Sequence, residues 1–274
     1  MYQKVLLQVD ESGQAAPKLA LFRIDQVPSA QFRVYLGRTT IESIDLDGNL
    51  LPIGSPIVAA ALGENSANQL EPDQAAWHNL RRSTQALNDL DAGIFAQGLA
   101  ITNWHLTHQH CPRCGTPTVI EKGGWSRRCF NDDRQVFPRT DPAIIVAVTD
   151  ESDRILLGSQ GVWEDNRWSV LAGYVEAGES LDQAVRREIA EEAGILVSDI
   201  HYRGSQPWPF PYSLMFGFSA KASSAHDLVP DGIEIEKLKW FSREELLAER
   251  ERILLPGRLS IARALIEDWL GEPL

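Results

Sequence analysis

Three glutamates, Glu188, Glu191 and Glu192, lie within five consecutive positions of the stretch REIAEEAG, residues 187–194. On a helix, side chains three and four positions apart share one face. Like charges at that spacing repel each other. Hard divalent cations such as Mg²⁺ and Mn²⁺ take oxygen ligands, so a bound cation would offset this repulsion. The alternative is a solvated helix face, which is what a run of charges usually forms.

The residues around this stretch predict a helix over residues 180–193, about 14 residues or close to four turns. Ser180 is a good N-cap and Gly194 is a good C-cap. The helix would pack through an apolar side, with the three glutamates pointing away from it. That side consists of Leu181, Ala184, Val185 and Ile189. Arg187 cannot neutralise three carboxylates, and it is better placed to pair with one acid and fix the loop.

The order of residues around this helix resembles the Nudix box. The fixed positions are Gly173, Glu179, Arg187-Glu188-Ile189, Glu191-Glu192 and Gly194-Ile195, separated by five, seven, one and one residues. The resemblance implies a Nudix α/β/α sandwich and hydrolysis of a nucleoside diphosphate linked to another group. In that reaction carboxylates hold Mg²⁺ or Mn²⁺, and water attacks a phosphorus of the diphosphate.

The same resemblance implies roles for individual residues. Glu188 and Glu192 correspond to the main metal ligands, and Glu191 to a further ligand or a base. Ala172 would contribute its backbone carbonyl to the metal. The residues that shape the loop and helix would be Gly173, Glu179, Arg187 and Gly194.

The stretch SQPWPFPYS, residues 205–213, alternates three prolines with two aromatic residues. Prolines stiffen the backbone and remove donors. Aromatic side chains on a rigid loop form stacking surfaces for flat rings, worth roughly 1–3 kcal/mol per stacked base. The alternative is a proline turn packed over the core.

This stretch, placed after the box, resembles the NADH pyrophosphatase subfamily of Nudix hydrolases. LMFGF after it and PRTDPAIIVAV before the box fit the same subfamily. The implied reaction cleaves NADH or NAD⁺ into nicotinamide mononucleotide and AMP, and the subfamily can also remove an NAD cap from RNA. The substrate-contacting residues would be Gln206, Pro207, Trp208, Pro209, Phe210, Pro211, Tyr212 and Ser213.

Three more residues follow from the position-by-position comparison. Glu234 corresponds to an extra metal-binding or catalytic glutamate, the alternative being an exposed loop acid. Phe137 occupies the place of an aromatic residue that contacts the substrate, where the subfamily can have tyrosine. Ala262 corresponds to a backbone contact in the closing helix. The resemblance also implies a homodimer in which both chains shape the pocket.

The three cysteines of the chain are Cys111, Cys114 and Cys129. A zinc ribbon has two Cys-x-x-Cys pairs, but the fourth position holds Asp132. Aspartate can bind zinc, so three thiolates and one carboxylate form a chemically possible Zn²⁺ site. The alternative is a ribbon without zinc that is held by packing, for example through Trp125 and Phe130.

The composition of the chain limits the classes of protein to which it can belong. A net charge of −12 argues against a binder of duplex DNA or of membrane surfaces, because such proteins need broad basic patches. No long apolar run predicts a transmembrane helix, and the N-terminus does not resemble a signal peptide. Three clustered cysteines favour metal binding in a reducing compartment over a disulfide framework. We therefore expect a cytoplasmic protein.

The expected fold is α+β in three parts. They are an N-terminal domain of mixed α/β structure (1–106), a small zinc-ribbon-like segment (107–140) and a Nudix domain (141–274). In the first part we expect strands at 4–9, 19–24 and 32–37 and helices at 72–90 and 92–108. In the third part we expect strands at 143–148, 154–158, 167–175, 212–220 and 237–241, and helices at 180–193, 242–251 and 258–270.

Two other functions remain open from the sequence. One is a Nudix hydrolase that prefers another dinucleotide, such as ADP-ribose or a diadenosine compound. The other is a catalytically idle nucleotide-binding module, although every carboxylate of the box is present.

Overall fold

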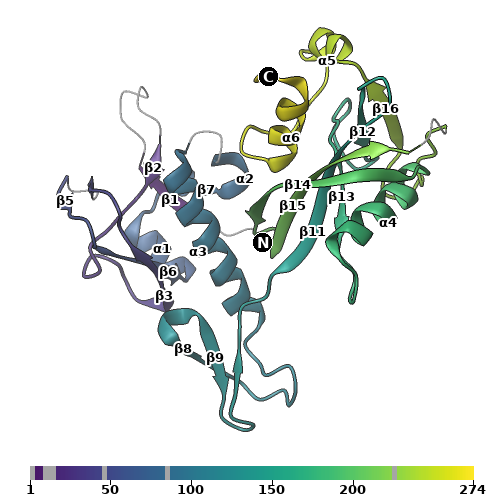
Figure 1. The fold of residues 1–274 in the computed structure, drawn as a ribbon. Coiled ribbons are helices and arrows are strands. Elements are labelled where there is room, and N and C mark those ends of the chain that lie inside the picture. Colours follow the sequence, from purple (N-terminus) through teal and green to yellow (C-terminus); the bar gives the residue numbers. More distant parts are fainter. Residues whose placement is uncertain (1–3, 9–16, 45–47, 84–86, 224–226) are drawn as a thin grey trace. The chain divides into compact units, whose positions relative to one another are not determined.

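The computed structural model describes residues 4–8, 17–44, 48–83, 87–223 and 227–274. The chain forms two compact units (Figure 1). Unit 1 comprises Met1–Arg139 together with the short segment Pro209–Tyr212. Unit 2 comprises Thr140–Trp208 and Ser213–Leu274.

Unit 2 is built on a six-stranded mixed sheet. Its strands are β11 (Asp141–Thr149), β12 (Ile155–Ser159), β13 (Leu171–Tyr174), β14 (Val197–Trp208), β15 (Ser213–Ala222) and β16 (Lys237–Phe241). Its helices are α4 (Leu181–Ala193), α5 (Arg243–Glu249) and α6 (Ile261–Leu270). The strand order is β14-β15-β11-β12-β16, with β13 paired to β11. β11 and β15 run parallel, and the other pairs are antiparallel.

The central strand β11 is buried on both of its faces, which explains its unbroken apolar sequence AIIVAV. Alternate residues point to opposite sides. Ile144, Val146 and Val148 join one apolar cluster with α4. Ile145 and Ala147 join another cluster with α6. The two helices therefore cover opposite faces of the sheet (Figure 1), which is the expected α/β/α sandwich.

Helix α4 begins and ends where its caps predict. Ser180 and Gln183 form a reciprocal capping box, and Gly194 ends the helix in the left-handed conformation at φ 71°. The predicted apolar side packs into the cluster under the sheet. The expectation that all three glutamates point away from this side is wrong, because Glu192 is only 3% exposed. Position 192 follows the buried Ile189 by three residues, so the two share a helix face.

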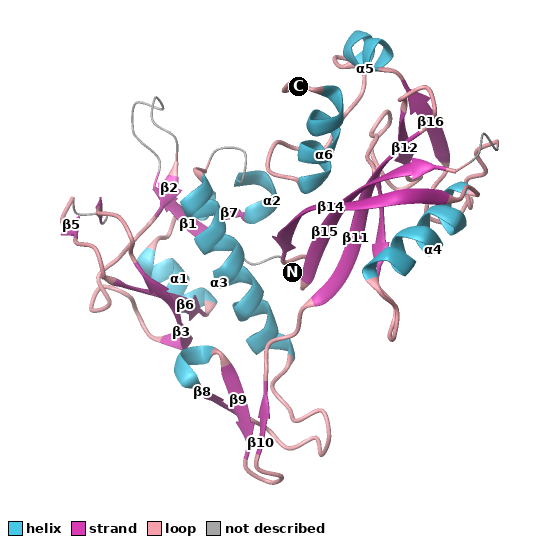
Figure 2. Ribbon diagram, viewed as in Figure 1, coloured by secondary structure: helices cyan, strands magenta, loops and turns pink. Residues whose placement is uncertain are grey.

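The described residues of unit 1 form four small sheets around the long helix α3 (Figure 2). The sheets are β2-β1-β7, β3-β6, β4-β5 and β10-β9-β8. The strands are β1 (Lys4–Gln8), β2 (Lys18–Leu19), β3 (Ala30–Arg38), β4 (Ser43–Ile44), β5 (Leu50–Leu51), β6 (Pro56–Leu62), β7 (Trp77–Asn79), β8 (Val119–Glu121), β9 (Ser126–Cys129) and β10 (Arg134–Val136). The helices are α1 (Glu64–Leu70), α2 (Leu80–Ser83) and α3 (Asp89–Thr107), with short 3₁₀ turns at Gln74–Ala76 and Lys122–Gly124.

Two expectations for unit 1 are wrong. The strand expected at 19–24 is reduced to the pair Lys18–Leu19. The helix expected at 72–90 is divided among a 3₁₀ turn, β7 and α2. Trp77 and Asn79 pair with β1, so tertiary pairing overrides the helix-compatible spacing. The helix expected at 92–108 is present as α3.

Polar contacts, most of them buried, hold the ribbon segment together and attach it to the rest of unit 1. Arg127 donates to the hydroxyl and the carbonyl oxygen of Thr118 and lies 3.1 Å from Nδ1 of His105 on α3. The other ring nitrogen of His105 lies 2.8 Å from the carbonyl oxygen of Gly124. Trp125 donates its indole N–H to the carbonyl oxygen of Tyr35 at 2.6 Å. A segment with little apolar content thus uses its neighbour for support.

In the part of the chain that the structure describes, no helix has both the length and the apolar character needed to cross a membrane.

Candidate active site and cysteine cluster

The three glutamates of α4 differ sharply in exposure because α4 is fixed by its apolar side. The side chain of Glu191 is 61% exposed, that of Glu188 is 12% exposed, and Glu192 is buried. The three glutamate side chains therefore range from solvent-exposed to buried within two helical turns. A purely solvated helix face does not describe this arrangement.

Arg187 pairs with more than one acid. Its guanidinium donates two hydrogen bonds of 2.9 Å to the Glu179 carboxylate, a bidentate arrangement. It also donates to Glu191 at 3.0 Å, lies 2.9 Å from Oε1 of Glu188, and donates to the carbonyl oxygen of Tyr174 at 2.9 Å. These bonds raise the pKa of Arg187, and the Arg187 contact is the largest cause that lowers the pKa of Glu179.

Glu192 is the most perturbed acid of the site. Burial raises its pKa to about 8, and the negative charges of Glu188 and Glu234 add to the effect. Its Oε2 atom is buried and has no hydrogen-bond partner. Burial is also the main reason that the pKa of Glu188 is raised. A buried carboxylate oxygen without a donor, facing other carboxylates, fits a divalent cation as its missing partner.

Gly173 is required by the close approach of β13 to α4. A Cβ atom at this position would lie 2.0 Å from Oε1 of Glu188. The neighbouring Ala172 is half-buried on the same strand and pairs with Ile145 of β11. The strand backbone therefore runs directly beside the carboxylate of Glu188.

Glu234 lies in the loop before β16 and is exposed, and its charge acts on both Glu188 and Glu192. Asp231 holds this loop, because its carboxylate accepts the N–H groups of Ile233, Glu234 and Ile235 at 2.8–3.2 Å. The sequence interpretation missed Asp231. The Asp-Gly pair at 231–232 is a turn signal that could have indicated it.

Residues 206–208 form the end of β14, a strand that the sequence interpretation also missed. Gln206 accepts the N–H of Ile261 at 2.8 Å and donates to the carbonyl oxygen of Leu259, so it is fixed beside the start of α6. Trp208 pairs with Ser213 across the hairpin. The Ser213 hydroxyl is buried and lies 3.1 Å from the hydroxyl of Tyr174.

The second half of the aromatic stretch packs in unit 1. Pro209 and Tyr212 are buried, and Phe210 packs against the cluster that contains Leu19 and Leu99. The Phe210–Pro211 peptide bond is cis. Pro207 and Pro211 are exposed. The packed proline turn therefore describes Pro209, Phe210 and Tyr212.

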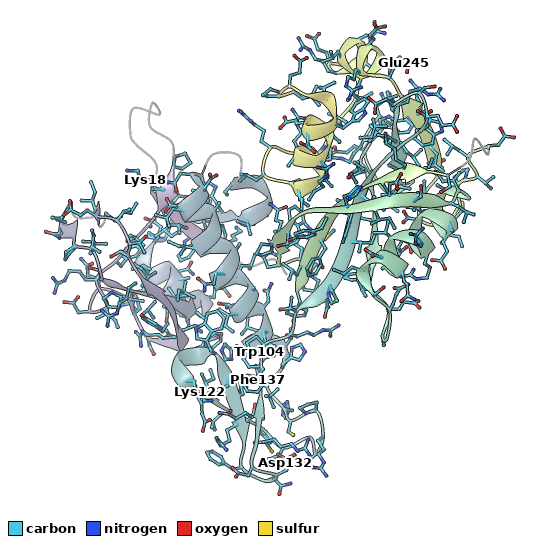
Figure 3. The ribbon with its side chains drawn as sticks, in the orientation of Figure 1. Lys18, Trp104, Lys122, Asp132, Phe137 and Glu245 are labelled. Carbon is cyan, nitrogen blue, oxygen red and sulfur yellow. The ribbon has the colours of Figure 1, made fainter. Side chains whose placement is uncertain are left out.

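The two remaining predicted contacts lie in different surroundings. Phe137, which is labelled in Figure 3, precedes β11 in the sequence. Its exposed fraction is 60%. Ala262 is buried in the cluster that holds α6, and its backbone N–H donates to Ser260 at 3.3 Å. Phe137 belongs to unit 1 and Ala262 to unit 2.

Cys111, Cys114, Cys129 and Asp132 form one cluster, and one ligand atom from each lies within 4.8 Å of the others. Asp132 lies toward the tip of the ribbon hairpin (Figure 3), and its Oδ2 is 3.5 Å from the Cys111 sulfur. Hydrogen bonds with Thr116 are the main reason that the pKa of Cys114 is lowered to about 6. Burial raises the pKa of Cys129 to about 11. The donor set fits a zinc ribbon with one carboxylate ligand.

Comparison with known families agrees with this geometry. Residues 139–258 match the NUDIX domain, and residues 106–137 match the NADH pyrophosphatase zinc ribbon domain. Residues 3–104 match the NADH pyrophosphatase-like rudimentary NUDIX domain. The chain belongs to the Nudix hydrolases. The order of the three matched domains assigns it, within that family, to the NADH pyrophosphatase type.

Two curated proteins that are similar to this chain are named NAD-capped RNA hydrolases. The chain is 40% identical over 201 residues to the NAD-capped RNA hydrolase NudC of Mycobacterium bovis, covering 70% of this chain and 64% of the relative. It is 36% identical over 198 residues to the human NAD-capped RNA hydrolase NUDT12, covering 67% of this chain and 43% of the relative. The aligned part thus spans less than two thirds of these relatives.

Proposed function

We propose that this chain is a metal-dependent diphosphatase that hydrolyses NADH or NAD⁺ to nicotinamide mononucleotide and AMP. The observation that carries the proposal is the set of carboxylate side chains on α4. One buried oxygen of Glu192 has no hydrogen-bond partner there, and the negative charges of Glu188 and Glu234 act on this side chain. Membership of the NADH pyrophosphatase type supports this choice of substrate over ADP-ribose or diadenosine compounds.

In this proposal the cation is Mg²⁺ or Mn²⁺. The residues that would hold it are Glu188, Glu191, Glu192, Glu234 and the backbone carbonyl of Ala172. When bound, such a cation neutralises the diphosphate and eases formation of a hydroxide nucleophile. Arg187 fixes the positions of three acids, because its guanidinium contacts the carboxylates of Glu179, Glu188 and Glu191. The proton of the attacking water passes to one of the carboxylates of Glu191, Glu192 and Glu234.

The proposed substrate contacts come from the aromatic stretch. Trp208 offers a flat surface for stacking with a base or nicotinamide ring. We further propose that the substrate is contacted by the hydroxyl of Ser213, the side chain of Gln206, the backbone of Ala262 and the ring of Phe137. A substrate bound through its dinucleotide part alone suits a chain with a net charge of −12. Removal of an NAD cap from RNA, the activity in the relatives' names, fits the same contact.

We propose Zn²⁺ as the occupant of the ribbon cluster, with Asp132 as the fourth ligand. The match to the zinc ribbon domain and the convergence of three thiols and one carboxylate support it. Asp132 is oriented for this role, because its Oδ1 accepts the N–H of Arg134 at 3.2 Å. A cluster of unpaired thiols is also consistent with the reducing environment of the cytoplasm, where we place the protein.

We also propose a homodimer. Two exposed apolar side chains, Tyr35 and Val58, are paired across β3 and β6, and Ile44 and Leu50 are paired across β4 and β5. Exposed apolar patches of this kind often mark protein interfaces. Sedimentation of the purified chain would distinguish the dimer from a monomer.

The decisive test of the activity is product analysis by mass spectrometry. The purified protein is incubated with NADH, Mg²⁺ or Mn²⁺ and ¹⁸O-labelled water. We expect AMP and reduced nicotinamide mononucleotide, with one labelled phosphate that identifies the attacked phosphorus. The matched control is Glu192→Gln, which should remain folded and lose turnover by more than about 100-fold.

Intact NADH under every metal condition, from a folded protein, would contradict the proposal. Turnover of ADP-ribose or a diadenosine compound in the same assay would then identify a different Nudix substrate. Binding of NADH without turnover of any of these compounds would identify a nucleotide-binding module.

A further inference from the structure

Residues 209–212 connect β14 to β15, and their contacts are those of unit 1. Trp208 pairs with Ser213 at the last step of the ladder, so these four residues form the whole connection. Pro209 and Pro211 have no N–H group to donate. Only Phe210 and Tyr212 of the four carry a backbone N–H, so most of the groups that can hold the connection are its carbonyl oxygens and its side chains.

Asn103 on α3 supplies a donor for these carbonyl oxygens. Its Nδ2 atom lies 3.3 Å from the carbonyl oxygen of Pro209 and 3.4 Å from that of Pro211. One helical turn further on, Thr107 forms a hydrogen bond between its hydroxyl and that of Tyr212. Asn103 and Thr107 are four residues apart, so both point to the same side of α3.

The side chains of the connection are fixed as well. Tyr212 is 9% exposed and packs with Val34, Ile101 and Trp104. The guanidinium of Arg139 lies 5.7 Å from the centre of the Tyr212 ring. Phe210 packs in the neighbouring cluster of unit 1. The connection is therefore held by the packing of Phe210 and Tyr212 and by the side-chain amide of Asn103 at Pro209 and Pro211.

We propose that Asn103 is a positioning residue for nucleotide binding, acting through the 209–212 connection on Trp208 and Ser213. The identity of the nucleotide rests on the proposed function. Trp208 and Ser213 are joined covalently to the connection, so loosening it gives both residues more conformations to lose when a nucleotide binds. Asn103 itself does not contact the substrate. Its loss weakens binding and leaves the carboxylate chemistry of α4 intact.

The test compares Asn103→Ala with a matched control, Asn68→Ala. Asn68 is an exposed residue of α1 in the same unit, and its side chain accepts a hydrogen bond from Gln74 at 2.7 Å. Steady-state kinetics with NADH and Mg²⁺ should show KM raised about tenfold by Asn103→Ala, equivalent to about 1.4 kcal/mol, with kcat within twofold. Asn68→Ala should leave both constants unchanged.

A second measurement does not depend on turnover. Amide hydrogen exchange of Phe210 and Tyr212 should become faster in Asn103→Ala and not in Asn68→Ala, and calorimetry should show AMP bound about tenfold more weakly. If Asn103→Ala does not fold, Tyr212→Phe, which keeps the ring and removes the hydroxyl, carries the same expectation with a smaller effect.

Unchanged KM and unchanged exchange in the Asn103 variant would overturn the inference. So would a fall in kcat at constant KM, because that would place the effect on the chemical step. Failure of the unmodified protein to hydrolyse NADH would overturn the proposed function instead, and the exchange and AMP measurements would still decide the role of Asn103.

Discussion

Glu188 and Glu192, four residues apart on α4, are carboxylates in surroundings that disfavour their charge. Burial is the first cause of both raised pKa values, and their neighbours Glu191 and Glu234 add negative charge. Such a group costs folding stability when it is ionised, which is acceptable if a cation compensates. The two glutamates are therefore placed where they favour binding of a cation over the stability of the cation-free fold.

The first prediction concerns Glu192 in the metal-free protein. Its folded pKa of about 8 lies above the ordinary value of 4.5, so the folded state binds this proton more tightly than the unfolded state. Stability is therefore lost as pH rises from about 4.5 to 8. We expect Glu192→Gln, in the presence of EDTA, to raise Tm by several degrees at pH 9 and to change it little at pH 4.5.

Thermal unfolding across this pH range checks the prediction. Mg²⁺ should reverse the order at high pH, because it stabilises the unmodified protein and not the variant. A Tm difference that does not depend on pH would contradict the burial argument for Glu192.

The second prediction concerns Gly173. An alanine there would place Cβ 2.0 Å from Glu188, so the strand or the carboxylate must move. We expect Gly173→Ala to lower kcat/KM by more than about 100-fold and stability by about 1–3 kcal/mol. Gly93→Ala on α3, where nothing lies within 4 Å of the added Cβ, should keep full activity and gain up to about 1 kcal/mol. Equal effects of the two substitutions would show that Gly173 has no steric role.

At the scale of elements, the loop before β16 is organised by one side chain. Asp231 accepts three successive backbone N–H groups, and these hydrogen bonds lower its pKa. Ile235, which follows Glu234, is buried in the cluster with α4. The loop is thus fixed at both sides of Glu234, which explains how an exposed acid influences the buried Glu192.

The third prediction follows from this loop. Asp231→Ala should reduce kcat/KM about tenfold or more and weaken Mg²⁺ binding, because Glu234 loses its fixed position. Asp231→Asn should keep most of the activity, since the amide oxygen can accept the same N–H groups. Titration of Mg²⁺ into both variants provides the measurement. An Asn variant as impaired as the Ala variant would assign Asp231 a direct role through its charge instead.

At the scale of the whole molecule, two kinds of metal site are proposed at separate places in the sequence. The carboxylates lie on α4 and in the loop before β16, and the thiols lie in the ribbon. Hard oxygen ligands suit Mg²⁺ or Mn²⁺, and thiolates suit zinc. The two sites should therefore respond differently to chelators and to substitution.

The fourth prediction separates them. The purified chain should carry one zinc ion by elemental mass spectrometry, and Asp132→Cys should retain it against a higher chelator concentration because it completes four thiolates. Asp132→Ala should lose it more readily. Cobalt substitution should give an absorption spectrum that changes between the unmodified chain and Asp132→Cys. Identical spectra for the two would mean that Asp132 is not a ligand.

The sequence alone determined the parts of this protein that depend on local order. Ser180 and Gly194 mark the two ends of α4, because helix caps act over a few residues. The spacing of Arg187, Glu188 and Glu192 indicated the family, because this spacing is also local. Only the tertiary structure decided the burial of Glu192, the pairing of 77–79 with β1 and the strand β14. It alone joined Asn103 to residues 209–212, more than 100 positions away. Burial and long-range pairing depend on which segments meet in the folded core, and that information is not contained in any short stretch of sequence.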